Sequence, residues 1–412
     1  MTTQAFGRDQ SYARKVNNEL VIQKLRKEDL SATELSSTLN LSHAAMSSIL
    51  KGLLGQGIIK VSCSKSEFGK GRKQVVYSLN EQYGLIIVVS LSDNRYSITI
   101  SNIKEEILVE RVKEIDKYDV SIIYEIVLCI KDLLANNEYR DIPLKNIIIS
   151  VPGRVNSITG ELQLSKQFDK NLFEGKNVIS SIFENYFQAP IYIQNDINLS
   201  IIGEMKCGRL SNVSNAMIAY IDNGMGGAMV FNNSFYGGEE GYAGELGLMS
   251  ANFRGEETYL DEFASLRSIK NYASSVLGRK FTVSSLITEY QKKGDIYDYV
   301  IETAHLVGKK LRDLVEVLNI SNIVLSGRVV MFGQDYLDAV KEELSKAKNQ
   351  CKVEYSELGK NSILIGAISK SVDQSIAHMS GKDFRDTFVF FIDNNSTSKP
   401  VSNRLCHLKK RL

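Results

Sequence analysis

The stretch from Met217 to Met249, MIAYIDNGMGGAMVFNNSFYGGEEGYAGELGLM, decides the fold of this chain. Its apolar runs 217–221 and 228–231 flank a polar, glycine-rich turn, which is the pattern of two strands in a hairpin. Glycines lack a Cβ atom, so they allow backbone N–H groups to approach a ligand oxygen or phosphate closely. Further glycines then surround the carboxylate of Glu245. The alternative interpretation is a loop-rich hairpin without a chemical role.

Length and composition indicate a globular protein of two to three domains, because the chain has 412 residues and domains average roughly 150. A net charge of +2 gives no overall basic field, so any nucleic-acid binding must be local. No run of about 18 apolar residues and no signal peptide is present, which predicts a cytoplasmic protein without a membrane partner. The five cysteines are scattered, as expected for reduced thiols.

The N-terminal region reads as a small helical unit. A first helix is expected within 17–27, and Ser31-Ala32-Thr33-Glu34 is a capping box that begins a second. Ser42 caps a third helix, whose apolar spacing places Ala45, Ile49, Leu50 and Leu53 in the core. Two alternating strands, 58–62 and 74–80, follow and enclose a basic loop. This order predicts a winged helix-turn-helix.

Two sets of residues in this unit are candidates for DNA contact. The third helix presents mostly short side chains that allow a close approach to base edges, and the loop tip carries cations for phosphates or a minor groove. The alternative is a winged helix used for protein contact, with solvated charges. The candidate DNA-binding residues are Ser42, His43, Ala44, Met46, Ser47 and Lys51 on the helix, and Lys70, Arg72 and Lys73 on the wing.

With these motifs in order, the chain resembles the ROK family of sugar kinases and sugar-responsive repressors. The glycine-rich hairpin is similar to the family's G-x-G-x-G turn, and Gly238, Gly241, Gly244, Glu245 and Gly247 match its G-x-x-G-x-x-G-E-x-G-H signature. The resemblance covers about residues 10 to 375. It implies an α/β fold in which an N-terminal winged helix-turn-helix precedes a two-lobed, actin-like (ribonuclease H-like) sugar-kinase body. The expected domains are 1–83 and 84–378, followed by an extension, 379–412, without an assigned role.

The nucleotide side departs from the family pattern. Kinases of the family carry D-x-G-x-T in the first hairpin of the body, where this chain has Ser90-Leu91-Ser92-Asp93-Asn94. Side chains there would crowd a phosphate and Asp93 would repel it. Because phosphoryl transfer depends on positioning and charge neutralisation, the loss argues against ATP chemistry. Arg328 replaces a glycine of the family on the same side.

The sugar side is better preserved. Pro152-Gly153-Arg154-Val155 matches the family's P-G-x-V loop beside the sugar, and Asn195-Asp196 matches the asparagine and aspartate of its E-N-D-A-N stretch. Carboxylates and amides after a strand can hydrogen-bond sugar hydroxyls, although Asn-Asp is also a common turn. Leu248 stands where the family has a histidine. The expected sugar-binding residues are Gly153, Asn195, Asp196, Glu245 and, in place of a family glutamate, Asp261.

The zinc motif of the family is missing. Its C-x-C-G-x-x-G-C-x-E knuckle should follow Leu248, but residues 252–261 contain no cysteine. Structural zinc needs about four Cys or His ligands. We therefore expect no metal and no cofactor.

These observations favour a transcriptional repressor of carbohydrate metabolism genes and not an enzyme. A winged helix would bind operator DNA, a degenerate kinase body would bind a sugar or sugar derivative, and the chain would form a homodimer or a dimer of dimers. Two alternatives remain: a sugar kinase with an added DNA-binding domain, and a DNA-binding regulator controlled by a protein partner.

Overall fold

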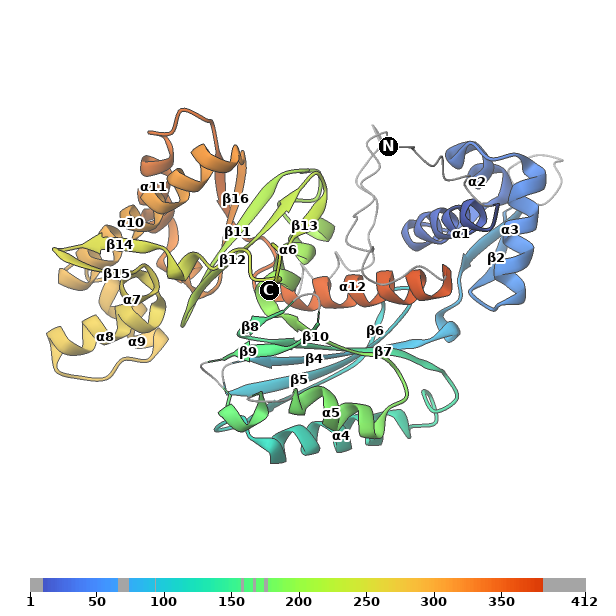
Figure 1. Ribbon diagram of the computed structural model, residues 1–412, viewed down its shortest axis with the longest axis horizontal. Helices are drawn as coiled ribbons and strands as arrows, with labels where there is room; N and C mark the ends of the chain where they lie inside the picture. The colour runs from blue at the N-terminus through green and yellow to red at the C-terminus, as the bar shows by residue number, and fades with distance from the viewer. Residues whose placement is uncertain are drawn as a thin grey trace, which may run out of the picture.

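The computed structural model describes residues 10–65, 74–92, 94–156, 159–165, 168–173 and 177–380 (Figure 1). Its N-terminal unit has the expected element order. The Ser31 hydroxyl accepts from Glu34 N at 3.3 Å, and Ser31 N donates to the Glu34 carboxylate at 2.7 Å, so the capping box is formed. The unit contains α1 (Gln10–Lys27), β1 (Leu30–Ser31), α2 (Ala32–Leu39), α3 (His43–Gly55), β2 (Ile59–Lys65) and β3 (Gln74–Leu79), with the described strands in the order β1-β3-β2.

The first lobe of the body is a twisted sheet with helices on both faces. Its five described strands lie in the order β10-β7-β4-β5-β6. The pairs β4–β5 and β5–β6 are antiparallel, whereas β4–β7 and β7–β10 are parallel. Helices α4 and α5 cover one face and α12 covers the other (Figure 1). The bounds are β4 (Leu85–Ser92), β5 (Arg95–Asn102), β6 (Ile107–Glu114), α4 (Val120–Leu134), β7 (Leu144–Val151), α5 (Val178–Tyr186), β10 (Ile191–Asn195) and α12 (Asn361–Ser380).

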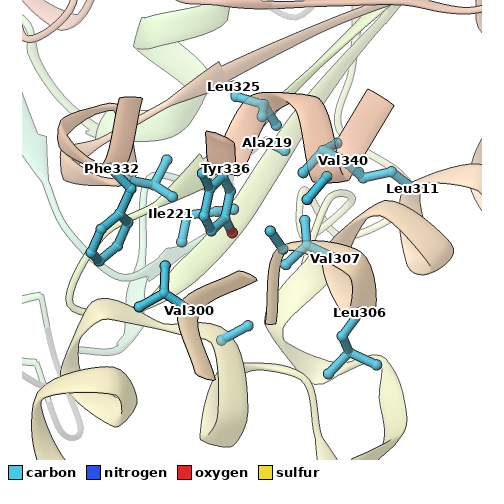
Figure 2. Close-up of a cluster of buried hydrophobic side chains, with 14 of the residues drawn as sticks. Ala219, Ile221, Val300, Leu306, Val307, Leu311, Leu325, Phe332, Tyr336 and Val340 are labelled. Atoms are coloured by element: carbon cyan, nitrogen blue, oxygen red, sulfur yellow. The ribbon is translucent and has the colours of Figure 1, made fainter. Parts of the chain in front are cut away.

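The second lobe repeats this topology. Its described strands lie in the order β13-β12-β11-β16-β17, again with two antiparallel and two parallel pairs. Apolar side chains of β11 and β16 pack against α10 and α11 around the buried ring of Tyr336 (Figure 2). The bounds are β11 (Ala216–Ile221), β12 (Met225–Phe231), β13 (Ser234–Tyr236), α10 (Asp295–Leu318), β16 (Asn322–Ser326), α11 (Gly333–Leu344) and β17 (Lys352–Tyr355). Two sheets of one topology, each with helices, confirm the expected actin-like fold.

Helices α6 (Asp196–Cys207) and α12 cross between the lobes at very close range. A Cβ atom on Gly203 of α6 would lie 2.0 Å from the Ser362 carbonyl oxygen, and one on Gly366 of α12 would lie 1.8 Å from that of Leu199. The Ser200 and Ser362 hydroxyls share a hydrogen bond of 2.7 Å. Because α6 contacts the second sheet and α12 the first, this crossing joins the lobes.

The remaining elements are short or peripheral. None of the described helices is long and apolar enough to cross a membrane. These elements are η1 (Glu81–Tyr83), β8 (Arg154–Val155), β9 (Leu162–Leu164), η2 (Lys170–Leu172), η3 (Leu246–Leu248), β14 (Ser250–Phe253), β15 (Glu256–Tyr259), α7 (Asp261–Ala264), α8 (Leu266–Leu277), α9 (Val283–Tyr290) and η4 (Arg328–Phe332).

Candidate functional site

Strands β7 and β10 end side by side, and three of the expected sugar-binding residues follow them. Asn195 at the end of β10 pairs with Val151 at the end of β7. The Asn195 side chain donates to the Gly153 carbonyl at 2.7 Å and accepts from Asn198 N at 3.0 Å, so it caps α6. Half-buried Asp196 is the first residue of that helix. The structure therefore brings Gly153, Asn195 and Asp196 together at the carboxyl ends of parallel strands, where open α/β sheets bind ligands.

The loop that carries Glu245 is fixed to β12 by its glycines. Gly244 has φ 101°, and a Cβ atom there would lie 2.1 Å from the Gly227 carbonyl oxygen. A Cβ atom on Gly247 would lie 2.7 Å from the Met225 carbonyl oxygen. Gly244 and Gly247 thus permit close packing of one backbone segment against another. The sequence had instead predicted that such glycines let the backbone approach a ligand.

Glu245 is exposed, yet it faces charge from the first lobe. Partial burial of its carboxyl raises its pKa, and the positive charge of Arg154 opposes that rise. The Arg154 guanidinium also stacks on the Tyr242 ring, with 4.0 Å between Cζ and the ring centroid. Arg154 follows β7 and Tyr242 lies in the glycine-rich loop, so this contact spans the two lobes. Sequence reasoning did not identify either residue as functional; the signal was a charged residue inside the P-G-x-V loop.

Asp261 has a different environment from the other expected ligands. Its carboxylate accepts from Met225 N at 2.8 Å and from the Arg267 guanidinium at 2.6 Å, and the residue is 7% exposed. Each oxygen thus accepts from one protein donor. These bonds make Asp261 hold the turn before β12, and its contact with a sugar stays a prediction.

In the two hairpins that would face ATP phosphates in a kinase of the family, backbone and side-chain groups already form hydrogen bonds within the protein. At the first hairpin, the Tyr118 hydroxyl accepts from Ser92 N at 2.9 Å and donates to the Ser92 carbonyl at 2.8 Å. At the second, Arg328 binds the Asp222 carboxylate through its backbone N at 3.1 Å and its Nε at 2.7 Å. Asp93 lies outside the described residues.

The hairpin at the position of the family's zinc knuckle is held without cysteine. Strands β14 and β15 pair directly, and Arg254 at their turn binds the Glu302 carboxylate at 2.8 and 3.0 Å. Elsewhere among the described residues, His305, Glu342 and Glu343 place possible metal-ligating atoms within 4.8 Å of one another. Lys346 at 2.8 Å and Arg312 at 3.3 Å already neutralise Glu343. We interpret this group as an ion-pair network.

Comparison with known proteins identifies the family. A model described as "ROK family" matches residues 96–371. The chain belongs to the ROK family.

Its relatives within this family include regulators and kinases. A xylose repressor of Caldicellulosiruptor bescii is 23% identical and covers 88% of this chain and 97% of its own length. The DNA-binding transcriptional dual regulator NagC of Escherichia coli is 19% identical over 76% of this chain and 80% of its own. A ROK-family transcriptional regulator, homologous to the E. coli MLC protein, superposes with a TM-score of 0.75 at 16% identity, covering 89% of this chain and 98% of that one. A ROK hexokinase from Thermus thermophilus superposes with a TM-score of 0.57 at 19% identity, covering 69% of this chain and 96% of that one.

In this ROK protein, the exposed face of α3 differs from the expected one at a single position. Ser42, His43, Ala44, Ser47 and Lys51 are exposed, as a DNA-contacting face requires. Met46 is 0% exposed, so its assignment to DNA contact was wrong. Met46 belongs to the apolar stripe with Ile49, Leu50 and Leu53, which share a face at three- and four-residue spacing. Lys70, Arg72 and Lys73 lie outside the described residues.

The N-terminal unit is attached to the body through a buried arginine that the sequence did not reveal. Arg26 of α1 donates to Glu105 from Nε at 2.7 Å, to Asp373 at 2.5 Å and to the Ser369 carbonyl at 3.0 Å. Glu105 also binds Lys206 of α6 at 3.2 Å. Burial disfavours charge on Arg26, but the charges of Asp373 and Glu105 outweigh it and raise its pKa. We call Arg26, Glu105, Lys206, Ser369 and Asp373 the Arg26 junction.

Proposed function

We propose that this ROK protein is a transcriptional repressor of carbohydrate metabolism genes that binds operator DNA through its N-terminal unit and a sugar or sugar derivative at Asn195, Asp196 and Glu245. The observation that carries the proposal is the Arg26 junction, because it fastens the proposed DNA-binding unit to α12 directly and to α6 through Glu105. Helix α6 begins at Asp196 and ends one residue after Lys206. One rigid helix therefore runs from the proposed sugar site to the base of the proposed DNA-binding unit.

A sugar kinase with an added DNA-binding unit is the weaker candidate. The turns that would have to hold ATP phosphates present Ser92 N to a tyrosine hydroxyl and Met225 N to a carboxylate. Phosphoryl transfer relies on such donors and on metal ions for charge neutralisation. A protein that uses these donors internally would have to break those bonds before it could bind a nucleotide. This supports a regulator that does not turn over ATP.

The proposed coupling needs two states of the body. A sugar that contacts Asp196 from the first lobe and Glu245 from the second would favour one arrangement of the lobes, and differential affinity is what shifts such an equilibrium. In a homodimer or a dimer of dimers, a change at the junction would alter the spacing of two DNA-binding units. Helix-turn-helix dimers read half-sites about one helical turn apart, so spacing controls affinity. Binding to DNA implies a cytoplasmic location.

The test is an operator-release experiment with Glu245→Ala. Operator fragments are first selected from random DNA by the wild-type protein, and D-xylose, other sugars and sugar phosphates are then screened for an effect on their release. Glu245→Ala should abolish release by the active sugar and leave sugar-free DNA affinity within a few fold. Glu240→Ala, an exposed acid of the same loop, is the matched control.

Two outcomes would contradict the proposal. If Glu245→Ala responds to the same sugar at the same concentration as wild type, the sugar site is wrong. If no sugar changes DNA affinity or melting temperature of the wild type, a regulator governed by a protein partner becomes the better explanation, because any ligand of the folded state raises the melting temperature.

A further inference from the structure

Two polar groups beside the proposed sugar site are buried and have no hydrogen-bond partner among the residues that the structure describes. They are the Nε of Arg154 and the hydroxyl of Tyr242. They belong to the two side chains that stack across the lobes at 4.0 Å. Leaving a buried polar group unsatisfied costs about 1–3 kcal/mol, so native structures contain few of them. A pair of unsatisfied groups in one contact points to a ligand that completes it.

The charge of Arg154 is also uncompensated by direct contact. Glu245 senses that charge, but the two side chains form no ion pair within 4.0 Å, and the described residues offer Arg154 no other carboxylate at that range. Two other arginines of the body differ. Arg267 binds Asp261 at 2.6 Å, and Arg328 binds Asp222 through Nε at 2.7 Å. Among the described residues, Arg154 therefore lacks the directly bonded carboxylate that Arg267 and Arg328 have.

The backbone around Arg154 is held in place. The Pro152 carbonyl accepts from the Ser165 hydroxyl at 2.7 Å, and the Gly153 carbonyl accepts from the Asn195 amide at 2.7 Å. The Tyr242 ring then supports one face of the guanidinium. A donor group positioned before binding loses little entropy when the ligand arrives.

We propose that the effector is an anionic sugar whose oxyanion, a phosphate or a carboxylate, binds to Arg154 and Tyr242 while its hydroxyls face Asp196 and Glu245. This inference rests on the proposed function. The Arg154 Nε can only donate, and the Tyr242 hydroxyl can donate as well as accept, so the acceptor oxygens of an oxyanion can satisfy both groups. An oxyanion also balances the guanidinium charge, which a neutral sugar hydroxyl does not. Charge-assisted bonds between guanidinium and oxyanion are about twice as strong as neutral ones.

The experiment compares anionic sugars with their neutral parents. Melting temperature and calorimetric affinity are measured for D-glucose, D-glucose 6-phosphate, D-glucuronate, D-xylose and D-xylonate, with inorganic phosphate alone as the control for non-specific anion binding. The proteins are wild type, Arg154→Met, Arg154→Lys, Tyr242→Phe and Arg140→Met. Arg140 lies in the same lobe and its side chain is 60% exposed, so it controls for loss of one positive charge.

We expect an anionic sugar to bind wild type on the order of tenfold or more tightly than its neutral parent. Arg154→Met should remove that advantage, Arg154→Lys should restore part of it, and Tyr242→Phe should weaken only the anionic ligand. Comparison of the affinities for the sugar phosphate and for the sugar carboxylates shows which oxyanion the site prefers.

Three results would overturn the inference. If neutral sugars bind as tightly as their anionic counterparts, or if Arg154→Met weakens both equally, the oxyanion assignment is wrong while the proposed function stands. If inorganic phosphate alone binds as tightly as any sugar, the site is a simple anion site. If no sugar of either kind binds, the proposed function falls with the inference.

Discussion

Replacing Arg26 by methionine should weaken the attachment of the N-terminal unit by about 3 kcal/mol. Breaking a buried ion pair by removing one partner typically costs about 3–5 kcal/mol, because the other charge stays buried. The Arg26 and Glu105 side chains are 4% and 1% exposed, so this regime applies. Glu105 would keep Lys206 at 3.2 Å, and Asp373 would keep Gln23 at 3.2 Å, which places the expected loss at the lower end of the range.

The loss should depend on pH in a defined direction. Burial raises the pKa of Glu105, but the charges of Arg26 and Lys206 outweigh it and lower that pKa below its ordinary value. A carboxyl with a lowered folded-state pKa contributes stability above its unfolded pKa of about 4.3, and the contribution is lost as pH falls through the folded pKa. The difference between wild type and Arg26→Met should therefore be complete at pH 7 and shrink under acid conditions.

Hydrogen exchange of α1 amides and urea unfolding followed by circular dichroism measure this loss. Exchange reports local opening, which matters because a chain with several domains need not unfold in one step. The chain has no tryptophan, so fluorescence is a poor probe. The matched control is Arg111→Met, since Arg111 forms an exposed pair with Asp132 at 3.0 Å and such pairs contribute about 0–1 kcal/mol.

A double variant separates charge burial from loss of packing. Arg26→Met combined with Glu105→Gln removes the buried carboxylate that the single change leaves without its main partner, so it should recover part of the stability. The junction does not hold the unit as argued if Arg26→Met lowers the protection of α1 amides by less than the Arg111→Met control does. The same conclusion follows if the stability loss of the double variant equals the sum of the losses of Arg26→Met and Glu105→Gln measured separately.

Three further predictions test other parts of the chain. Changing Lys70, Arg72 and Lys73 together to alanine should weaken operator binding and reduce its salt slope by up to about 2.7, from three phosphate contacts; unchanged binding across salt concentrations would exclude the wing from the interface. Protein purified without added metal should contain far less than one zinc per chain by elemental analysis, and hexoses or pentoses with ATP should give no sugar-dependent ADP release. Gly366→Ala should destabilise the folded protein by about 1–3 kcal/mol or more, since its Cβ would lie 1.8 Å from a carbonyl oxygen, whereas Gly55→Ala, with nothing within 4 Å, should lower the melting temperature little.

The fold followed from local signals that the structure reproduces. The Ser31 capping box and the Ser42 cap begin α2 and α3 where the sequence predicts. The glycine-rich hairpin formed, with Ile221 and Met225 paired across its turn. These features depend on residues close together in sequence, where capping, alternation and turn chemistry act directly. The wrong assignment of Met46 also concerns a local signal, the helical spacing of α3. That spacing places Met46 on the buried face, but the prediction put the neighbouring residue there instead.

The site was less accessible to sequence reasoning, because its contacts join distant segments. Arg154 and Tyr242 meet only when the two lobes are in place, and pattern alone gave no reason to pair them. Asp261 was predicted to bind a sugar, and the structure shows that Met225 N and Arg267 already donate to its oxygens. A motif specifies which residue type follows a strand or turn. It does not specify whether another part of the chain supplies the hydrogen bonds first.

The closeness of α6 and α12 determines how the proposed sugar signal can travel. With twelve residues, α6 is about 18 Å long, and its contact with α12 at Gly203 and Gly366 leaves no room for a side chain. Sliding of one helix over the other would bring carbonyl oxygens into collision, so the pair should move as one body. Asp373 and Ser369 on α12 and Lys206 on α6 then reach the Arg26 junction together. The N-terminal unit would follow this helix pair, and a sugar bound at Asp196 would act on DNA by rotating the pair relative to the second lobe.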